Sequence, residues 1–268
     1  MKKENSNLQE AYNQRSFDKA PKIYRDISFA KLIYRAIGLN ETSVNLKVLD
    51  LMSGPGKLAR ELAKQLPATY YCLDFAGSQL SKISPEVSTS RILAEVQSLP
   101  IEFESFDVVV VRFGIKDLTI DAQPSVIAGL FRILKPNGCL IVADMMAPEG
   151  ADEWLNTQHA LKQELGGRNP QIEGKCNIPS EAEWIGLLEN AGFQAEVFER
   201  SVSCVNTNDW KKSKQVSGMQ LVKLNKMIKD APDHIKRVLN IRQDSSGLKI
   251  DYPLVVLKAI KLSSEKTN

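Results

Sequence analysis

Four consecutive valines at residues 108–111 place the strongest constraint on how this chain can fold. Branched apolar side chains favour a strand, and successive side chains of a strand point to opposite faces of the sheet. A strand that is apolar on both faces belongs in the middle of a parallel sheet that helices cover on both sides. The sequence therefore predicts an α/β protein.

Strand and helix patterns alternate on both sides of the valines. Alternation of this kind gives parallel strands joined by right-handed crossovers, and such a doubly wound sheet binds its ligand at the carboxyl ends of the strands. The strand-like runs are residues 46–52, 69–75, 90–96, 107–113 and 138–146, and the helical patterns are residues 23–37, 57–66 and 123–135.

Beyond residue 150 the alternation gives way to several helical patterns and two further strands. We expect a mostly parallel, seven-stranded, Rossmann-like sheet in one domain, with helical insertions before the last strands. The later helices are predicted at residues 152–165, 180–191, 218–229 and 232–242, and the later strands at 195–203 and 252–262. The predicted parts are a helical N-terminal arm or lid (1–40), a cofactor-binding core (41–150), a substrate-side elaboration with the last strands (151–262) and a disordered tail (263–268).

The composition excludes several classes of protein. With 43% hydrophobic and 25% charged residues, the 268-residue chain has enough apolar side chains for a sizeable core. No apolar run approaches the roughly 18 residues of a membrane span, and the polar N-terminus does not resemble a secretory signal. The four cysteines form no C-x-x-C pair, and no His/Cys cluster predicts a metal site. We expect a cytoplasmic, reducing setting.

A strand that runs into a Gly-x-Gly turn is the strongest local signal. Asp50 is followed by Gly54 and Gly56, after which a helix begins. Glycine lets the backbone pass close to a ligand, and the start of the helix presents free N–H groups there. The same spacing, with Ala59 and with Asp74 about 20 residues on, also satisfies the dinucleotide-binding fingerprint. The turn alone leaves both kinds of ligand open.

Two acids separate these alternatives. Asp50 would repel a pyrophosphate just beyond it, whereas it suits a ligand with an ammonium or sulfonium charge. Glu95, at the end of the third strand, can accept a hydrogen bond from an adenine amino group. Together with Asp74 they fit an adenosine joined to a cationic amino acid better than a dinucleotide. They favour S-adenosyl-L-methionine over a nicotinamide cofactor.

Six short motifs then occur in order between residues 46 and 148. They resemble the successive motifs of class I S-adenosylmethionine-dependent methyltransferases, nearest to the branch that contains the ubiquinone/menaquinone C-methyltransferases. The resemblance implies an S-adenosyl-L-methionine-dependent biosynthetic enzyme that methylates a small-molecule or lipid-like acceptor at carbon or oxygen by in-line displacement. The motifs are DLMSGPG at 50–56, CLDF at 72–75, AEVQSLP at 94–100, SFD at 105–107, FGIKD at 113–117 and LKPNG at 134–138.

The resemblance also implies roles for individual residues. The turn would hold the methionine end of the cofactor, and the N-terminal arm would close over it with aromatic residues. In this sequence the implied residues are Met52, Ser53, Gly54 and Gly56 in the turn with Asp50 in support, Asp74 for the ribose, Phe75 against the adenine, Glu95 and Val96 at the adenine edge, Arg112 beside the methionine and the reacting methyl, and Tyr12 and Tyr24 in the arm.

Two residues are candidates for catalysis. His159 lies on the helix that follows the fifth strand, and Asp144 ends that strand, facing the crevice by topology. A general base is needed only if the nucleophile still holds its proton. The alternatives are that His159 is an ordinary core or surface residue and that Asp144 is a capped carboxylate that holds a loop.

The positive charge is concentrated late in the chain. Residues 207–242 hold nine Lys or Arg and three Asp, and Lys223, Lys226 and Lys229 follow a helical spacing of three. Such a stripe is either a solvated helix face or a docking surface for an acidic carrier protein, an anionic membrane surface or an anionic substrate. This leaves open a carboxyl O-methyltransferase that acts on a carrier-bound acyl group, and a non-catalytic S-adenosylmethionine-binding module.

Nucleic-acid methylation is disfavoured. DNA amino-methyltransferases carry an Asn/Asp-Pro-Pro-aromatic loop after the fourth strand to grip a flipped base. Residues 112–115 read RFGI at that place. We therefore expect no nucleic-acid partner.

Overall fold

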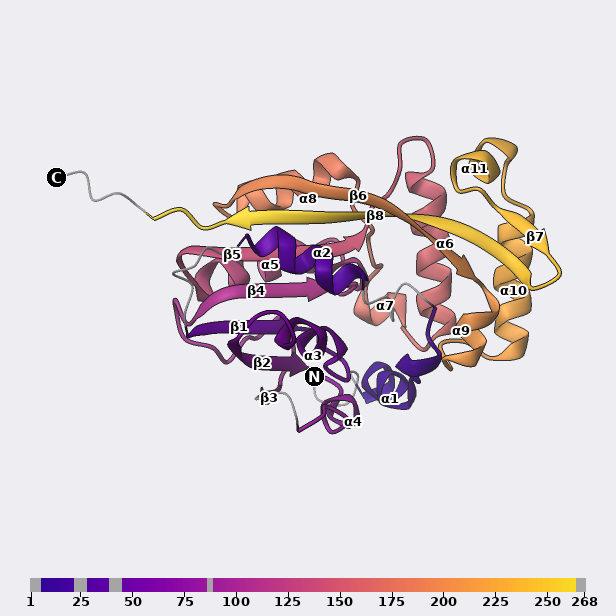
Figure 1. Ribbon diagram of the computed structural model, residues 1–268. Helices are drawn as coiled ribbons and strands as arrows, with labels where there is room; N and C mark the ends of the chain where they lie inside the picture. The colour runs from indigo at the N-terminus through magenta and orange to yellow at the C-terminus, as the bar shows by residue number, and fades with distance from the viewer. Residues whose placement is uncertain (1–5, 22–27, 39–44, 86–88, 264–268) are drawn as a thin grey trace.

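The computed structural model describes residues 6–21, 28–38, 45–85 and 89–263. Strands and helices alternate through the first half, and they form one sheet with helices on both faces (Figure 1). The strands are β1 (Leu46–Leu51), β2 (Ala68–Asp74), β3 (Thr89–Leu93), β4 (Phe106–Arg112), β5 (Leu134–Met145), β6 (Gln194–Asn206), β7 (Arg242–Asp244) and β8 (Gly247–Ile260). The α-helices are α1 (Ser6–Gln14), α2 (Ser28–Ile37), α3 (Lys57–Ala63), α4 (Gly77–Leu80), α5 (Ala122–Ile133), α6 (Asp152–Leu165), α7 (Pro170–Glu173), α8 (Glu181–Asn190), α9 (Asn208–Lys212), α10 (Gly218–Lys229) and α11 (Asp233–Val238), and single 3₁₀ turns lie at Phe17–Lys19 and Ile115–Asp117.

The strand order is β3-β2-β1-β4-β5-β8-β6, and the short β7 pairs with β8 beside this path. Strands β1 to β5 pair in parallel, whereas β8 runs antiparallel to β5, β6 and β7. The predicted doubly wound, mostly parallel sheet is confirmed, with eight strands in the described residues where the sequence predicts seven.

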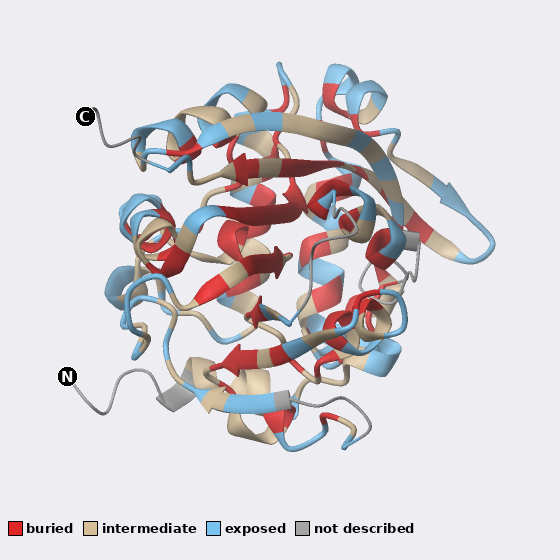
Figure 2. Ribbon diagram, turned by 60° about the vertical axis from the view of Figure 1, so that its left-hand side comes forward, coloured by how far each residue is buried: buried red, intermediate tan, exposed pale blue. Residues whose placement is uncertain are grey.

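The valines of β4 occupy the predicted position at the centre of the sheet. Val108 and Val110 face a core shared with α2 and α3, and Val109 and Val111 face a second core with α5 and α8. All four are buried, and Figure 2 shows buried residues gathered along the middle of the sheet with exposed residues on the outer helices. Burial on both faces explains the uninterrupted apolar run.

The C-terminal part differs most from the prediction. Helix α11 ends at Val238, short of the predicted residue 242, because Arg242–Asp244 forms β7 and turns back into β8. Asp244 Oδ1 accepts hydrogen bonds from the Ser246 N–H and hydroxyl, and Gly247 takes a φ of +137° that favours glycine. Strands β6 and β8, of 13 and 14 residues, reach past the parallel strands to α9, α10 and β7 (Figure 1).

Over the described part of the chain, no helix combines the length and the apolar character that crossing a bilayer requires.

Candidate cofactor and acceptor groove

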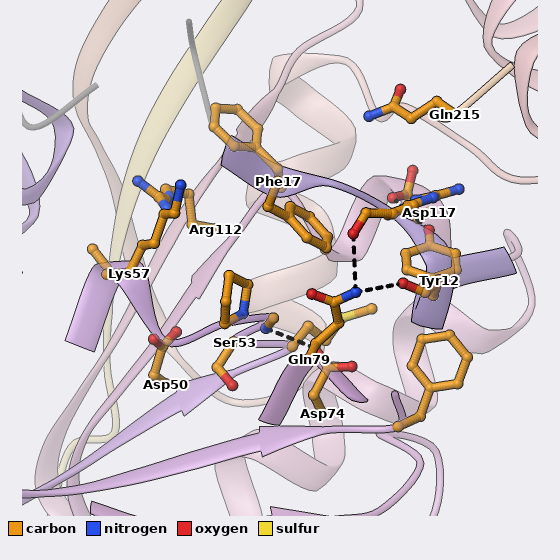
Figure 3. A pocket seen from close by; sticks show the side chains of 18 of the residues that line it. Tyr12, Phe17, Asp50, Ser53, Lys57, Asp74, Gln79, Arg112, Asp117 and Gln215 are labelled. Atoms are coloured by element: carbon orange, nitrogen blue, oxygen red, sulfur yellow. Dashed lines mark hydrogen bonds between the residues drawn. The ribbon is translucent and has the colours of Figure 1, made fainter. Parts of the chain in front are cut away.

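A groove lies where β1, β2 and β4 end, at the edge of the sheet where the topology predicts a ligand. It consists of two adjoining hollows that share Tyr12, Met52, Asp74, Phe75 and Asp117. Figure 3 shows the first hollow, with side chains from the strand ends, the N-terminal arm and α4 around it. One continuous groove therefore passes the ends of several strands.

The glycine turn forms the floor of the first hollow. Met52, Gly54 and Gly56 have φ values of 55°, 53° and 66°, so three residues of one loop are left-handed. A Cβ on Gly56 would lie 2.9 Å from Ile83 Cγ1, so the close packing of the backbone at this point requires glycine. The turn is tied to the next strand because Ser53 N–H donates to Leu73 O at 3.0 Å.

Asp50 is a buried acid beside this turn. Its side chain accepts a hydrogen bond from Ala59 N at 3.1 Å, and the residue is 2% exposed. Burial raises the pKa of Asp50 to about 7, against the opposing effect of Arg112. A ligand cation at this place would stabilise the ionised carboxylate.

Ser53 supplies a further polar group at the same wall. Its hydroxyl oxygen is buried and has no hydrogen-bond partner within the described residues, although Ser53 lines the groove. A buried hydroxyl without a partner is unfavourable, and a polar ligand group can satisfy it. Together with Asp50, it fits the amino and carboxylate groups of a bound amino acid.

Asp74 connects the turn to β2. Its Oδ2 accepts from Gly54 N at 2.7 Å and its Oδ1 from Ala76 N at 2.9 Å, and burial raises its pKa. Each carboxylate oxygen has a second lone pair for a ribose hydroxyl. The second hollow continues past Asp74 to Glu95 and Val96. The acids at the ends of β1 and β2 and just beyond β3 thus lie along one groove, as predicted.

The N-terminal arm lies across the groove as the resemblance implies. Gln9 donates to Phe75 O at 2.5 Å, and the Tyr12 ring meets the Phe75 ring edge-on with centroids 5.1 Å apart. Buried Gln79 donates to the carbonyls of Tyr12, Asn13 and Arg15, at 2.7, 3.2 and 3.2 Å. Figure 3 shows the Gln79 amide beside Tyr12. The other arm residue, Tyr24, lies outside the described residues.

Asp117 is the centre of a cluster that the sequence does not reveal. Its Oδ1 accepts from Gln163 Nε2 at 2.6 Å and lies 3.1 Å from both Lys116 Nζ and His159 Nε2, and its Oδ2 accepts from the Tyr12 hydroxyl at 3.2 Å. Despite its burial, Lys116 and His159 hold the pKa of Asp117 well below its usual range. Asp117 lies in the motif after β4, next to Lys116, but its other partners come from distant parts of the chain.

The structure places both sequence candidates for catalysis behind the groove wall. His159 and Asp144 are 1% and 0% exposed, and neither lines the groove. Burial lowers the pKa of His159 to about 4, so the neutral ring donates to Asp117. Asp144 accepts from the N–H groups of Lys116 and Met145, and burial raises its pKa to about 6. This geometry favours the alternative interpretation of a core histidine and a capped carboxylate.

Several groove residues were missed from the sequence. Lys57 directly follows the glycine turn and Gln79 lies on α4, whereas the others come from the arm, from α6 and from the loop before α10, which no local motif connects to the turn. The missed residues that line the first hollow are Arg15, Phe17, Lys57, Gln79, Lys162, Gln163 and Gln215. No group of three or more potential metal ligands occurs in the described ranges.

The solved structures that superpose on this chain have the same fold, a sheet in this order with helices on both faces. The match to a methyltransferase-domain model and to curated methyltransferases supports the resemblance predicted from the sequence. The YcgJ protein of Bacillus subtilis superposes with a TM-score of 0.73 at 16% identity over 88% of this chain and 98% of that one. Phosphoethanolamine N-methyltransferase 2 of Haemonchus contortus, solved with S-adenosylhomocysteine, superposes with a TM-score of 0.55 at 13% identity over 88% of this chain and 53% of that one.

Residues 48–138 match the family model described as a methyltransferase domain. The demethylmenaquinone methyltransferase of Protochlamydia amoebophila is 27% identical over 154 residues, which cover 54% of this chain and 57% of that protein. The chain spans about 57–60% of the length of the first two curated relatives that it matches.

Proposed function

We propose that the chain is an S-adenosylmethionine-dependent methyltransferase that methylates a small-molecule or lipid-like acceptor, such as a quinone-like ring, at carbon or oxygen. The observation that carries the proposal is the groove in which Asp50, Asp74 and Glu95 follow one another beside the left-handed turn. A pyrophosphate at the turn would lie against Asp50, whereas an ammonium group there would be attracted.

Each part of the cofactor has residues that fit it. The Asp50 carboxylate and the Ser53 hydroxyl suit the amino-acid end, and Arg112 adds a positive charge on the same side of the groove (Figure 3). Asp74 suits the ribose hydroxyls, and Phe75, Glu95 and Val96 suit the adenine in the second hollow. When bound, S-adenosylmethionine supplies a methyl group on a sulfonium, whose departure leaves a neutral thioether.

The chain's own contribution to the reaction is to position the acceptor and exclude water. The arm covers the groove through Tyr12 and Phe17, and the Phe17 ring lies 3.8 Å from where a Cβ on Gly54 would be. An enclosed groove aligns the acceptor with the methyl group, and orientation of this kind can supply about 7–11 kcal/mol of the barrier in favourable cases. The arm must open for the ligands to exchange.

The test begins with binding. The purified protein is titrated calorimetrically with S-adenosylhomocysteine and, separately, with NADH. We expect binding of the first and none of the second, and the reverse result would overturn the proposal. A methyl-labelled donor is then supplied with a panel of quinols and phenols. Transfer of label to an acceptor is expected, whereas binding without transfer to any of them would favour a non-catalytic S-adenosylmethionine-binding module.

One observation favours a second acceptor class. The basic segment at residues 207–242 borders the groove, because Gln215 lines it and Ser213 O accepts from Ser16 N of the arm at 3.0 Å. The exposed Lys211 and Lys223 lie in the same segment. An acidic carrier protein could dock there and present an acyl carboxylate for O-methylation. Activity on a carrier-bound acyl group that falls steeply with salt, with none on the free acid, would support this alternative.

A further inference from the structure

Charged side chains lie along both long sides of the first hollow. Figure 3 places Asp50, Lys57 and Arg112 along one side and Asp117 along the other, with Tyr12 and Gln215. We call this second side the α6 wall. It consists of Arg15, Asp117, Lys162, Gln163 and Gln215.

The carboxylate of the α6 wall is fully engaged. Asp117 Oδ1 has three partners at 3.1 Å or less, among them the ammonium of Lys116, which is 1% exposed. Lys116 Nζ also donates to Phe113 O at 2.9 Å. Asp117 and the nearby Asp144 carry at most two negative charges. One of these offsets Lys116, which leaves at most one for any further cation. Arg15 and Lys162 both lie close to this cluster. Arg15 also lies close enough to Asp74 to lower the pKa of that carboxyl, so Arg15 has a second carboxylate nearby.

Lys162 forms no ion pair with a carboxylate in the part of the chain that the structure describes. Within the described residues no hydrogen bond or ion pair reaches its ammonium, whose recorded contact is the buried Trp210 ring, 5.4 Å from the ammonium to the centroid. Burial, with Lys116 and Arg15 nearby, lowers the pKa of Lys162 to about 8, although Asp117 opposes this. A half-buried ammonium that lacks an acceptor is unfavourable until a ligand supplies negative charge.

The cofactor does not supply that charge. S-adenosylmethionine carries a sulfonium, an ammonium and a carboxylate, so it adds one net positive charge to the groove. Its amino-acid end fits the opposite side, where Asp50, Ser53, Lys57 and Arg112 gather. Binding of the cofactor therefore adds positive charge to the hollow that the α6 wall faces.

We infer that Lys162, supported by Arg15, binds the methyl acceptor as an oxyanion, that is, as a phenolate or enolate. The inference rests on the proposed function and deepens it by specifying the ionisation state of the acceptor. The hydroxyl proton leaves to solvent when the acceptor binds, and the oxyanion attacks the methyl carbon. The S–CH₃ bond breaks, the sulfur keeps the electron pair, and one cation and one anion become two neutral products.

This arrangement needs no general base in the groove. Positive charge close to a hydroxyl lowers its pKa, typically by about 1–3 units for an adjacent unit charge. His159 and Asp144 can then remain buried behind the wall, where the structure places them. If the acceptor is methylated at carbon, the same anion delivers its electron pair through the ring, and the displaced ring proton leaves afterwards.

The experiment uses 4-nitrophenol as a probe, because its anion absorbs visible light and its neutral form does not. The full chain is saturated with S-adenosylhomocysteine, so no transfer occurs, and the probe is titrated with pH in the presence and absence of protein. We expect the bound probe to ionise at lower pH, with an anion-to-neutral ratio raised about tenfold near neutrality. Lys162→Gln should abolish the shift, and Lys162→Arg should retain it.

Lys226→Gln is the matched control, because it removes the same charge from an exposed position on α10. The S-adenosylhomocysteine affinity of each variant is measured by calorimetry alongside the spectra. If the homologue fails to bind the unmodified chain, the proposed function itself is wrong. If the homologue binds but the probe does not bind or does not shift, the inference is wrong. It is equally wrong if the shift survives in Lys162→Gln, or if that variant loses the homologue, since Lys162 would then serve the cofactor.

Discussion

The two sides of the groove are assembled in different ways. On the glycine-turn side, carboxylates bind backbone N–H groups a short distance away in sequence, with separations of 9 residues for Asp50 to Ala59, 20 for Asp74 to Gly54 and 2 for Asp74 to Ala76. On the α6 wall, the Asp117 carboxylate pairs with the adjacent Lys116 and accepts from side chains 105 and 46 positions away, Tyr12 in α1 and Gln163 in α6. One side is local and uses the backbone, and the other is long-range and uses side chains.

The difference suggests a division of labour. Backbone N–H groups are present whatever the side chains are, so a turn and two acids can bind the same ligand throughout a family. Side chains from elements outside the parallel strands can be exchanged without disturbing that turn. We therefore expect changes on the turn side to affect cofactor binding most and changes on the α6 wall to affect the acceptor most.

The largest effect is expected from Asp74→Ala. The substitution leaves the Gly54 and Ala76 N–H groups without their acceptor and removes the predicted ribose partner. Hydrogen bonds to a charged group contribute about 1.5–3 kcal/mol each, so losing more than one should weaken S-adenosylhomocysteine binding more than about a hundredfold. Calorimetric titration measures this. The exposed Asp121→Ala is the control, and an Asp74 variant that binds within threefold of the unmodified chain would contradict the prediction.

Asp50→Asn tests the same side through pH. Because burial raises the pKa of Asp50 to about 7, the carboxyl is mostly protonated at pH 6, and a ligand cation favours its ionised form. S-adenosylhomocysteine affinity should therefore increase from pH 5.5 to 7.5, by up to about tenfold per pH unit, and level off above pH 7.5.

Asparagine at position 50 can still accept from Ala59 N but carries no charge. The variant should bind roughly ten- to a hundredfold more weakly at pH 8, with a flat profile. A profile unchanged by the substitution would show that Asp50 is not the titrating group.

The same contrast explains how far the sequence could predict the molecule. The alternating patterns and the valines of β4 determine the sheet, and the local turn reveals Asp50, Gly54 and Asp74, because each depends on neighbours in sequence. The sequence did not reveal Lys162 or Arg15 as groove residues, since only the folded chain brings α6 and the arm together. The β7–β8 hairpin was missed because β7 has only three residues and directly follows a stretch with a helical pattern.

Gln79→Ala should show a smaller effect that both sides share. Gln79 is 1% exposed, and its amide holds the carbonyls of Tyr12, Asn13 and Arg15. Without it these acceptors lose a partner, which costs about 1–3 kcal/mol of arm stability. Hydrogen exchange should increase across residues 8–20, and S-adenosylhomocysteine affinity should fall about tenfold.

The exposed Gln14→Ala removes an amide from the same arm and serves as the control, since it bonds only to Glu10 among the described contacts. If exchange in the arm is unchanged in Gln79→Ala, the arm is not held by this residue. If the acceptor KM changes while S-adenosylhomocysteine affinity stays the same, the arm serves the acceptor side of the groove and not the cofactor side.

The smallest effect is expected from Tyr12→Phe, which separates the two sides within one residue. The ring contact with Phe75 belongs to the adenine hollow, and the hydroxyl contact with Asp117 belongs to the α6 wall. Burial raises the pKa of Tyr12 to about 12, so the hydroxyl is a neutral donor at any assay pH. Phenylalanine keeps the ring and removes the donor, which should change the acceptor KM by about two- to tenfold while S-adenosylhomocysteine affinity stays the same.

Tyr12→Ala removes both contacts and should weaken the binding of both ligands. If the phenylalanine variant weakened S-adenosylhomocysteine as much as it raised KM, the hydroxyl would serve the cofactor, and the α6 wall could not be treated as a separate acceptor side.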